Sequence, residues 1–257
     1  MERLDLYLFK SGKFVSRERA KDAILDGQVF VDGKIAKPSQ KVCGDEEIKI
    51  GETLKYVSRG ALKLEKAIKE FNLDLNGKTV LDIGSSTGGF TEVAILNGAK
   101  KVFAVDVGSN QLDEKLRKDK RVVAFENTDF RTIKKEKIEE ANFIVSDVSF
   151  ISLKNIFPKI LEVFGSKIEC MVLFKPQFEC GKELAKKFQG VILDKKVHLN
   201  LLTDFVEYIK IYGFMVSEIS YSPIKGKSGN IEYLLHLNGS KSNFNIQKTV
   251  TEAFDKL

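Results

Sequence analysis

VLDIGSSTGGF, residues 80–90, begins as an apolar run with a single acid, Asp82, and continues into hydroxyl residues set between glycines. An apolar run that breaks abruptly into glycine predicts a buried strand ending in a loop. We expect a helix to begin near Phe90. Because open α/β sheets bind ligands where their strands end, this loop is predicted to be a binding loop.

The chain from residue 58 onward alternates between predicted strands and predicted helices. Strands are expected at 79–83, 101–106, 121–126, 142–147 and 169–174, with helices at 59–71 and 195–212 and further helical stretches between. This alternation predicts an α/β fold with a Rossmann-like, doubly wound parallel sheet. Two β-rich runs, 214–222 and 231–237, have no helix between them, so we expect an antiparallel pair at the sheet edge.

Residues 1–57 follow a different pattern, which predicts a small α+β domain and a connector ahead of a larger domain at 58–257. Ser16 can cap a helix, and Gly27 can end that helix in a left-handed conformation. Asp32–Gly33 lies between two β-prone triplets, as in a tight hairpin, and the run EEIKI offers a third strand.

The composition indicates a folded protein without a membrane span. Hydrophobic residues make up 43% of the 257 residues and charged residues 30%, which excludes a disordered chain. No run approaches the roughly 18 to 20 apolar residues of a membrane helix, so we expect a cytoplasmic protein. The formal net charge of +6 mildly favours a polyanionic partner.

The cysteines and histidines do not form a recognisable metal or nucleophile pattern. Cys43, Cys170 and Cys180 are odd in number and form no CxxC pair, so neither a disulfide framework nor a zinc cluster is predicted. His198 and His236 are far apart, and we expect both to be structural. No metal is therefore expected.

The glycine loop differs from the motifs that bind phosphate. It has no lysine after its glycines, as GxxxxGK[ST] requires, and it is not GxGxxG. The charge of Asp82 would also lie close to a phosphate. An acid suits a ligand with an ammonium or sulfonium group, while a helix N-terminus suits a carboxylate. S-adenosylmethionine carries all three groups and is the predicted cofactor.

Two further acids are expected where the next strands end. Asp106 lies about twenty residues after Gly84, where doubly wound folds bind ribose hydroxyls. Asp129 follows the third strand and could meet the amino group of adenine. Each acid alone could equally be a helix cap or a solvated loop residue. The predicted cofactor-binding residues are Asp82, Gly84, Ser85, Ser86, Thr87, Gly88, Gly89, Phe90, Asp106 and Asp129.

The motifs that follow the fourth and fifth strands limit which atom of the substrate can receive the methyl group. Amino-group methyltransferases of nucleic acids usually carry [DN]PP[YF] after the fourth strand, whereas this chain has SDVSF. Methylation at pyrimidine C5 would need a thiolate, and Cys180 has no supporting motif. Four charged residues, Lys63, Asp147, Lys175 and Glu232, are expected at the catalytic edge of the sheet and favour a hydroxyl acceptor.

Residues 1–57 hold eleven Lys/Arg against ten Asp/Glu, so only the placement of the charges favours nucleic acid. The candidates for RNA phosphate contacts are Lys10, Lys13, Arg17, Arg19 and Lys21. On charge alone, a solvated helix face is the simpler interpretation. The run RLDLYLFKSGKFVSRERAKDAILDGQVFVDGK, however, resembles the alpha-L RNA-binding domain of ribosomal protein S4. That resemblance implies that this domain presents a basic face to structured RNA.

Five segments resemble the TlyA family, which is known both as haemolysins and as ribosomal RNA 2′-O-ribose methyltransferases. They are SRGALKL, VLDIGSSTGGFTEV, SDVSFISL, FKPQFE and SPIKGKSGNIEYL. The methyltransferase domain of that family is similar to the FtsJ group, whose Lys-Asp-Lys-Glu tetrad matches Lys63, Asp147, Lys175 and Glu232. The resemblance implies methylation of ribosomal RNA within ribosomal subunits, at cytidines of the small subunit, the large subunit or both.

Three residues near the expected site, Arg59, Lys225 and Lys227, could add phosphate contacts. Lys175 is the candidate for contact with the 2′-hydroxyl. As a base it must be neutral, and lowering a lysine pKa from about 10.4 to about 7 costs about 4 kcal/mol. The alternative is an orienting lysine, with water taking the proton. Two other functions stay open, a membrane-active haemolysin and a non-catalytic ribosome assembly factor.

Overall fold

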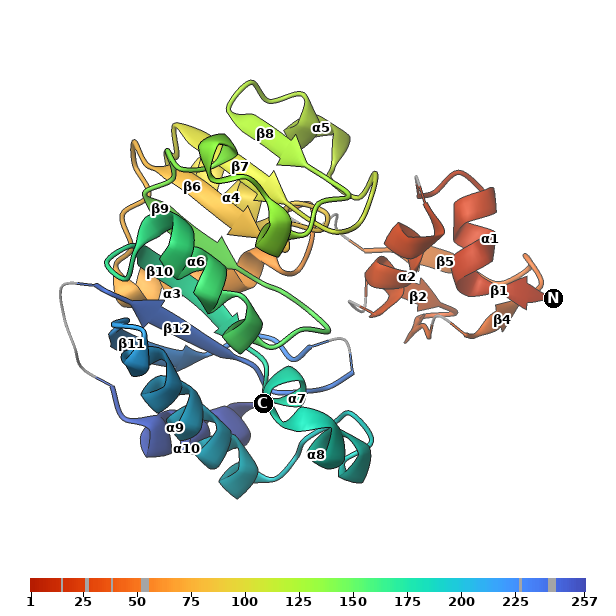
Figure 1. Cartoon of the computed structure of the whole chain (residues 1–257). Helices are drawn as coiled ribbons and strands as arrows, with labels where there is room; N and C mark the ends of the chain where they lie inside the picture. Colours follow the sequence, from red (N-terminus) through yellow and green to blue (C-terminus); the bar gives the residue numbers. More distant parts are fainter. Residues whose placement is uncertain (15, 26–27, 38, 52–55, 227, 240–243) are drawn as a thin grey trace. The chain divides into compact units, whose positions relative to one another are not determined.

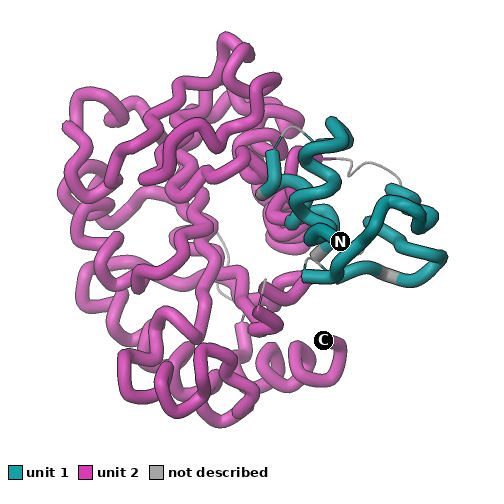
Figure 2. The backbone as a smooth tube through the Cα atoms, turned by 90° about the vertical axis from the view of Figure 1, so that its right-hand side faces the viewer, with its two compact units in different colours: residues 1–55 teal, residues 56–257 magenta. Residues whose placement is uncertain are grey.

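The computed structural model describes residues 1–14, 16–25, 28–37, 39–51, 56–226, 228–239 and 244–257. The chain divides into two compact units, residues 1–55 and 56–257, which Figure 2 colours differently. Each unit has its own hydrophobic core. Gly27, which we expected to end a helix, lies outside the described residues.

The first unit packs two short helices against short antiparallel strands. Its elements are β1 (Glu2–Arg3), α1 (Leu4–Lys10), α2 (Arg17–Leu25), β2 (Val29–Val31), β3 (Lys34–Ile35), β4 (Lys41–Val42) and β5 (Ile48–Ile50). The Arg19 backbone N–H donates to Ser16 Oγ at 3.1 Å, which confirms the predicted cap of α2. Asp32 and Gly33 have positive φ values of 49° and 73°, and β2 pairs antiparallel with β3 and β5. The predicted hairpin and third strand are therefore confirmed.

The second unit is built on one seven-stranded sheet with the order β11-β12-β10-β9-β6-β7-β8. Its strands are β6 (Thr79–Ile83), β7 (Lys101–Val105), β8 (Val122–Phe125), β9 (Phe143–Ser146), β10 (Glu169–Phe174), β11 (Val216–Tyr221) and β12 (Tyr233–Leu237). The first five are parallel, while β12 runs antiparallel to both β10 and β11. This arrangement confirms the predicted doubly wound sheet and its antiparallel final pair.

Helices cover both faces of this sheet (Figure 1). They are α3 (Ala61–Phe71), α4 (Gly89–Leu96), α5 (Glu114–Arg117), α6 (Phe157–Phe164), α7 (Pro176–Glu179), α8 (Gly181–Lys187), α9 (Lys195–Ile211) and α10 (Ile246–Lys256), with 3-10 turns η1 (Phe130–Thr132), η2 (Lys135–Lys137) and η3 (Leu153–Asn155). Successive strand residues point to opposite faces. Val80 accordingly packs in the cluster with α3 and α4, and Leu81 in the cluster with α6 and α9.

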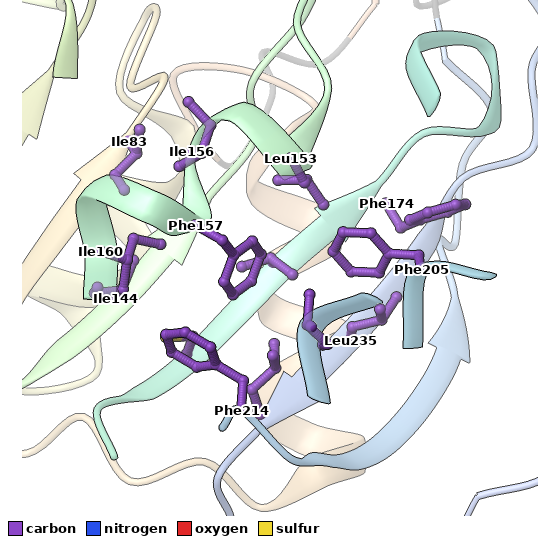
Figure 3. Close-up of a cluster of buried hydrophobic side chains, with 14 of the residues drawn as sticks. Ile83, Ile144, Leu153, Ile156, Phe157, Ile160, Phe174, Phe205, Phe214 and Leu235 are labelled. Carbon is purple, nitrogen blue, oxygen red and sulfur yellow. The ribbon is translucent and has the colours of Figure 1, made fainter. Parts of the chain in front are cut away.

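The larger of these two clusters is rich in aromatic side chains (Figure 3). The Phe157 ring lies 5.8 Å from the Phe205 ring and 5.0 Å from the Phe214 ring, both edge to face. The ring of Phe174, at the end of β10, lies with its centre 5.2 Å from the centre of the Phe205 ring. Phe174 immediately precedes Lys175 in the sequence. The packing of Phe174 in this core therefore fixes where the Lys175 backbone lies at the edge of the sheet.

The order in which the chain adds strands to the sheet reverses at β6. After β6 the chain adds β7 and β8 on one side, and it then returns to place β9 on the other side of β6. The two strands end together, and the Asp147 backbone N–H donates to Ile83 O at 3.1 Å. Open α/β sheets bind ligands at such a switch point, so the fold brings the glycine loop and Asp147 to one place.

In the part of the chain that the structure describes, every helix is too short or too polar to cross a bilayer.

His236 connects the final three strands at the opposite edge of the sheet. Its Nδ1 lies 3.1 Å from Glu218 Oε2 on β11, and its Nε2 lies 2.9 Å from Glu169 Oε1 on β10. Burial disfavours the charged ring, but the hydrogen bonds and charges of the two carboxylates more than offset this and raise the pKa of His236 above its ordinary value. The ring therefore links β10, β12 and β11, and the two carboxylates favour its protonated form.

We expect this pairing to make stability depend on pH. A raised pKa in the folded state means that the stabilisation is complete below the usual histidine pKa of about 6.5 and is lost as the pH rises through the raised value. His236→Gln should therefore cost about 1 kcal/mol of unfolding free energy near pH 6 and less near pH 9. Urea unfolding at both pH values measures this, and an equal loss at both would contradict it.

Candidate active site

The glycine loop between β6 and α4 is tightly packed at its backbone. Gly84 has a φ of +84°, and a Cβ there would lie 2.9 Å from the Asp147 carbonyl oxygen. Gly88 has a φ of +96° and caps α4, and a Cβ at Gly89 would lie 2.9 Å from the Ala61 backbone nitrogen. A Cβ at Gly84 would meet the segment after β9, and one at Gly89 would meet the start of α3. A Cβ at Gly88 would meet the Leu112 and Leu116 side chains, so the loop lacks side chains because its neighbours approach it closely.

Asp82 lies in β6 beneath this loop and is completely buried. Its Oδ2 accepts a 2.6 Å hydrogen bond from Thr91 Oγ1, whereas its Oδ1 has no partner among the described residues. Burial raises the pKa of Asp82 to about 7, against the lowering effect of the Thr91 hydrogen bond. A buried carboxylate oxygen left without a donor is costly, and such an atom commonly marks a place where a ligand donates.

The two acids predicted after the following strands have different surroundings. Asp106 accepts hydrogen bonds from the backbone N–H groups of Ser86 at 2.8 Å and Gly108 at 2.7 Å, so it fastens the glycine loop. Asp129 caps η1 through the Arg131 N–H and forms a 2.6 Å ion pair with the Arg131 guanidinium. The hydrogen bond from Arg131 holds the pKa of Asp129 below its usual range. A helix cap was the alternative to ligand binding that the sequence left open for this acid, and Asp129 does form such a cap.

Four predicted residues from four different segments meet at the carboxyl edge of the sheet. Lys63 on α3 lies 3.0 Å from Asp147 Oδ2 and 2.9 Å from Glu232 Oε2. Lys175, which follows β10, lies 2.5 Å from Asp147 Oδ1. The side chains are nearly buried, with 9% of Lys63, 7% of Lys175, 17% of Asp147 and 4% of Glu232 exposed. The structure therefore joins them in one chain of ion pairs.

The charges of this network depend on one another. Burial disfavours the Asp147 carboxylate, but the ammonium groups of Lys63 and Lys175 outweigh it and hold the pKa of Asp147 far below its usual range. Burial likewise disfavours the Lys63 ammonium, and Asp147 and Glu232 outweigh it and raise the pKa of Lys63. Both groups stay charged near neutral pH. Asp147 is consequently a poor proton acceptor and a good anchor for two cations.

Sequence reasoning missed Ser149, whose Oγ accepts a 2.8 Å hydrogen bond from Lys175 Nζ. Its position in SDVSF, two residues after Asp147, is the feature of the sequence that could have indicated a place near the site. An ammonium has three donors. Asp147 and Ser149 use two of those on Lys175 and leave a third for a substrate oxygen.

The predicted RNA-binding residues are distributed over both units. Lys10 pairs with Glu2 and Arg17 with Asp5, so part of the basic face of the first unit is neutralised internally. Lys13, Arg19 and Lys21 lie on the same unit, and Arg59 and Lys225 belong to the second unit. Lys227 lies outside the described residues.

Cys180, the alternative nucleophile, is in an environment that disfavours a thiolate. It is half-buried after α7, and burial raises the pKa of its thiol. A thiolate nucleophile needs an electropositive setting that lowers this pKa. The surroundings therefore argue against methylation at a pyrimidine carbon.

Comparison with known proteins finds two families. Residues 56–239 match the FtsJ-like methyltransferases and residues 2–48 the S4 domain. The chain is 46% identical to "Putative rRNA methyltransferase YqxC" of Bacillus subtilis, covering 92% of this chain and 85% of that protein. It is 36% identical to "16S/23S rRNA (cytidine-2′-O)-methyltransferase TlyA" of Mycobacterium tuberculosis, covering 91% and 89%. A solved structure named "Putative hemolysin from Streptococcus thermophilus" is 41% identical, covers 99% of this chain and 96% of that chain, and has a TM-score of 0.78.

Substitution of Gly84 should show how closely β6 and β9 approach. Gly84→Ala and Gly77→Ala both place alanine at a positive φ, +84° and +69°, but only the first brings its Cβ within 2.9 Å of a backbone oxygen. We expect Gly84→Ala to lower the unfolding free energy by about 2 kcal/mol more than the matched control. Chemical denaturation of both variants measures this, and equal losses would refute the close approach.

Proposed function

We propose that this chain, which belongs to the FtsJ-like methyltransferases and to the TlyA family, is a ribosomal RNA methyltransferase. In the proposed reaction it transfers a methyl group from S-adenosylmethionine to 2′-hydroxyl groups of the RNA. The observation that carries this proposal is the buried ion-pair network of Lys63, Asp147, Lys175 and Glu232 beside the glycine loop. Such a network can hold a neutral hydroxyl in place, and it contains no thiol or histidine.

The residues around the glycine loop fit the proposed donor. The partnerless Oδ1 of Asp82 offers an acceptor, and the loop glycines admit a ligand close to the backbone. Asp106 uses two of its roughly four lone-pair positions on Ser86 and Gly108, which leaves capacity for ribose hydroxyls. We assign donor binding to Asp82, Gly84, Ser85, Ser86, Thr87, Gly88, Gly89, Phe90, Asp106 and Asp129. When bound, S-adenosylmethionine supplies a methyl group on a positively charged sulfur.

In the proposed reaction, the tetrad positions the acceptor hydroxyl. The third donor of Lys175 would bind one lone pair of the 2′-oxygen and leave the other lone pair free for attack. Asp147 holds Lys175 in place and is itself held by Lys63, which Glu232 anchors from the far side. Fixing a weak nucleophile in this way supplies much of the rate enhancement that methyl transfer needs. The hydroxyl proton would pass to water as the oxygen gains the methyl group.

The first unit would supply affinity for the folded RNA. Its S4 domain match and its basic residues Lys13, Arg19 and Lys21 fit phosphate contacts that position the substrate without reading its sequence. Arg59 and Lys225 would add contacts from the second unit. By analogy with the relative from Mycobacterium tuberculosis, we infer cytidines within ribosomal subunits as the targets and the cytoplasm as the place of action.

The direct test is transfer of a labelled methyl group to purified ribosomal subunits. Lys175→Ala should reduce transfer at least a thousandfold and leave donor binding, measured by calorimetry, within about twofold, because the lysine is assigned to the acceptor. Lys210→Ala removes an exposed lysine paired with Glu207 and should match wild type. Wild-type protein that binds subunits but transfers no methyl group would instead support a non-catalytic assembly factor.

The pH dependence of single-turnover transfer distinguishes the two roles of Lys175. Asp147, whose own pKa is held very low, is an anion throughout the neutral range and keeps a cation beside it. We therefore expect an orienting ammonium and a rate that changes less than about threefold between about pH 7 and pH 9. A rate that rises close to tenfold per pH unit would show that neutral Lys175 takes the proton.

A further inference from the structure

Residues 181–196, here called the basic arm, connect two parts of the candidate active site. The arm comprises α8, the turn that follows it and the first two residues of α9. It begins after α7, the short helix that Lys175 caps. Figure 1 shows α7 and α8 standing away from the sheet beyond the end of β10. None of the seven residues of α8 is fully buried, and its four charged residues are all exposed.

The far end of the arm is fastened next to Glu232. Asn230 Nδ2 donates to Gly190 O at 2.8 Å, and the Ile192 N–H donates to Asn230 Oδ1 at 3.0 Å. His198 extends this attachment, because its Nε2 lies 2.9 Å from Ile192 O and its Nδ1 lies 2.8 Å from the Tyr233 hydroxyl.

All of these side chains are buried, with 2% of Asn230 and none of His198 or Tyr233 exposed. A carbonyl can only accept, so His198 carries its proton on Nε2 and accepts from Tyr233 on Nδ1. Asn230 and Tyr233 flank Glu232 in the sequence. The arm is therefore attached on both sides next to tetrad residues, through α7 after Lys175 and through Asn230 before Glu232.

The charge on this arm is strongly positive. It carries Lys182, Lys186, Lys187, Lys195 and Lys196 against two acids, Glu183 and Asp194. The Asp194 carboxylate is occupied in capping α9. Among the described residues, none of the five ammonium groups forms an ion pair. Lys182 and Lys186 are one helical turn apart and repel each other. Lys187 Nζ lies 5.5 Å from the centre of the Phe188 ring, and all five lysines are at least partly exposed, so a polyanionic partner can reach them.

We propose that the basic arm binds the phosphodiester backbone of the RNA on either side of the target ribose. The inference rests on the proposed function, because it is the tetrad that brings an RNA strand to this edge. Lysines contact phosphates as point charges and fix the register of the strand without reading its bases. The arm would therefore add to the substrate affinity that the first unit supplies, while the tetrad would govern the chemical step.

The test compares two triple variants of the full chain. Lys182→Gln/Lys186→Gln/Lys187→Gln removes three charges from the arm. The control, Lys134→Gln/Lys135→Gln/Lys137→Gln, removes three charges from η2 and its cap, near the edge where the strands begin. Like the arm lysines, these three form no ion pair among the described residues. Binding to ribosomal subunits is measured by filter retention at several salt concentrations, and transfer is measured with labelled donor.

We expect the arm variant to bind at least tenfold more weakly than wild type near 0.1 M salt, with a salt slope smaller by about 2. The KM for subunits should rise, while kcat and donor affinity stay within about twofold. The control variant should keep wild-type affinity and slope. Equal affinity and slope for both variants would overturn the proposal.

Circular dichroism and a second variant keep the result interpretable. Because Lys182, Lys186 and Lys187 are exposed, the substitutions should leave the fold intact. If the triple variant unfolds, Lys195→Gln/Lys196→Gln should still lower the salt slope, by about 1.5, and an unchanged slope would overturn the proposal. Binding is scored without methyl transfer, so wild-type protein that binds through the arm yet transfers nothing would refute the proposed function alone.

Discussion

The candidate active site depends on one carboxylate, Asp147, that is paired on both sides with buried lysines. Its two oxygens lie 3.0 Å from Lys63 and 2.5 Å from Lys175. Charges removed from water are tolerated only with close partners, and removing one partner leaves the others uncompensated. The three side chains therefore have to be assembled together, and the fold achieves this by ending β6, β9 and β10 at one edge. Lys63 reaches the same point from α3, which packs across the sheet.

The close approach of β9 to the glycine loop follows from the same requirement. Asp147 contacts both lysines while its backbone lies against Gly84, where a Cβ would come within 2.9 Å of the Asp147 carbonyl oxygen. The glycine thus serves two purposes, because it leaves room for a ligand and it also lets the acid after the neighbouring strand come close. Asp82 lies in β6 beneath this loop and is completely buried. Its burial raises its pKa to about 7.

Much of this architecture could be predicted because the strands are short, apolar and clearly bounded. The predicted segments 79–83 and 169–174 agree with β6 and β10 residue for residue, and the residues matched to the tetrad do meet. The contacts made within the loops could not be predicted. Asp106 receives the N–H groups of Ser86 and Gly108, and Lys175 reaches Ser149, because loop conformations bring them together. Residue types and spacing carry little information about where a loop turns its amide groups.

A network that is fully paired before substrate arrives has a cost and an advantage. Burying four charges opposes folding, and apolar residues of similar size would often serve stability at least as well. The advantage is that Lys175 is already oriented by Asp147 and Ser149. In the proposed reaction a substrate hydroxyl would meet a fixed donor, and little reorganisation would be needed when it reacts. Residues outside the tetrad contribute to this order. Asn230 and Tyr233 hold the chain on both sides of Glu232 through Ile192 and His198, so the position of the acid that anchors Lys63 depends on hydrogen bonds from a segment nearly forty residues earlier in the chain. The geometry of the tetrad therefore depends on this buried polar attachment as well as on the four charged residues.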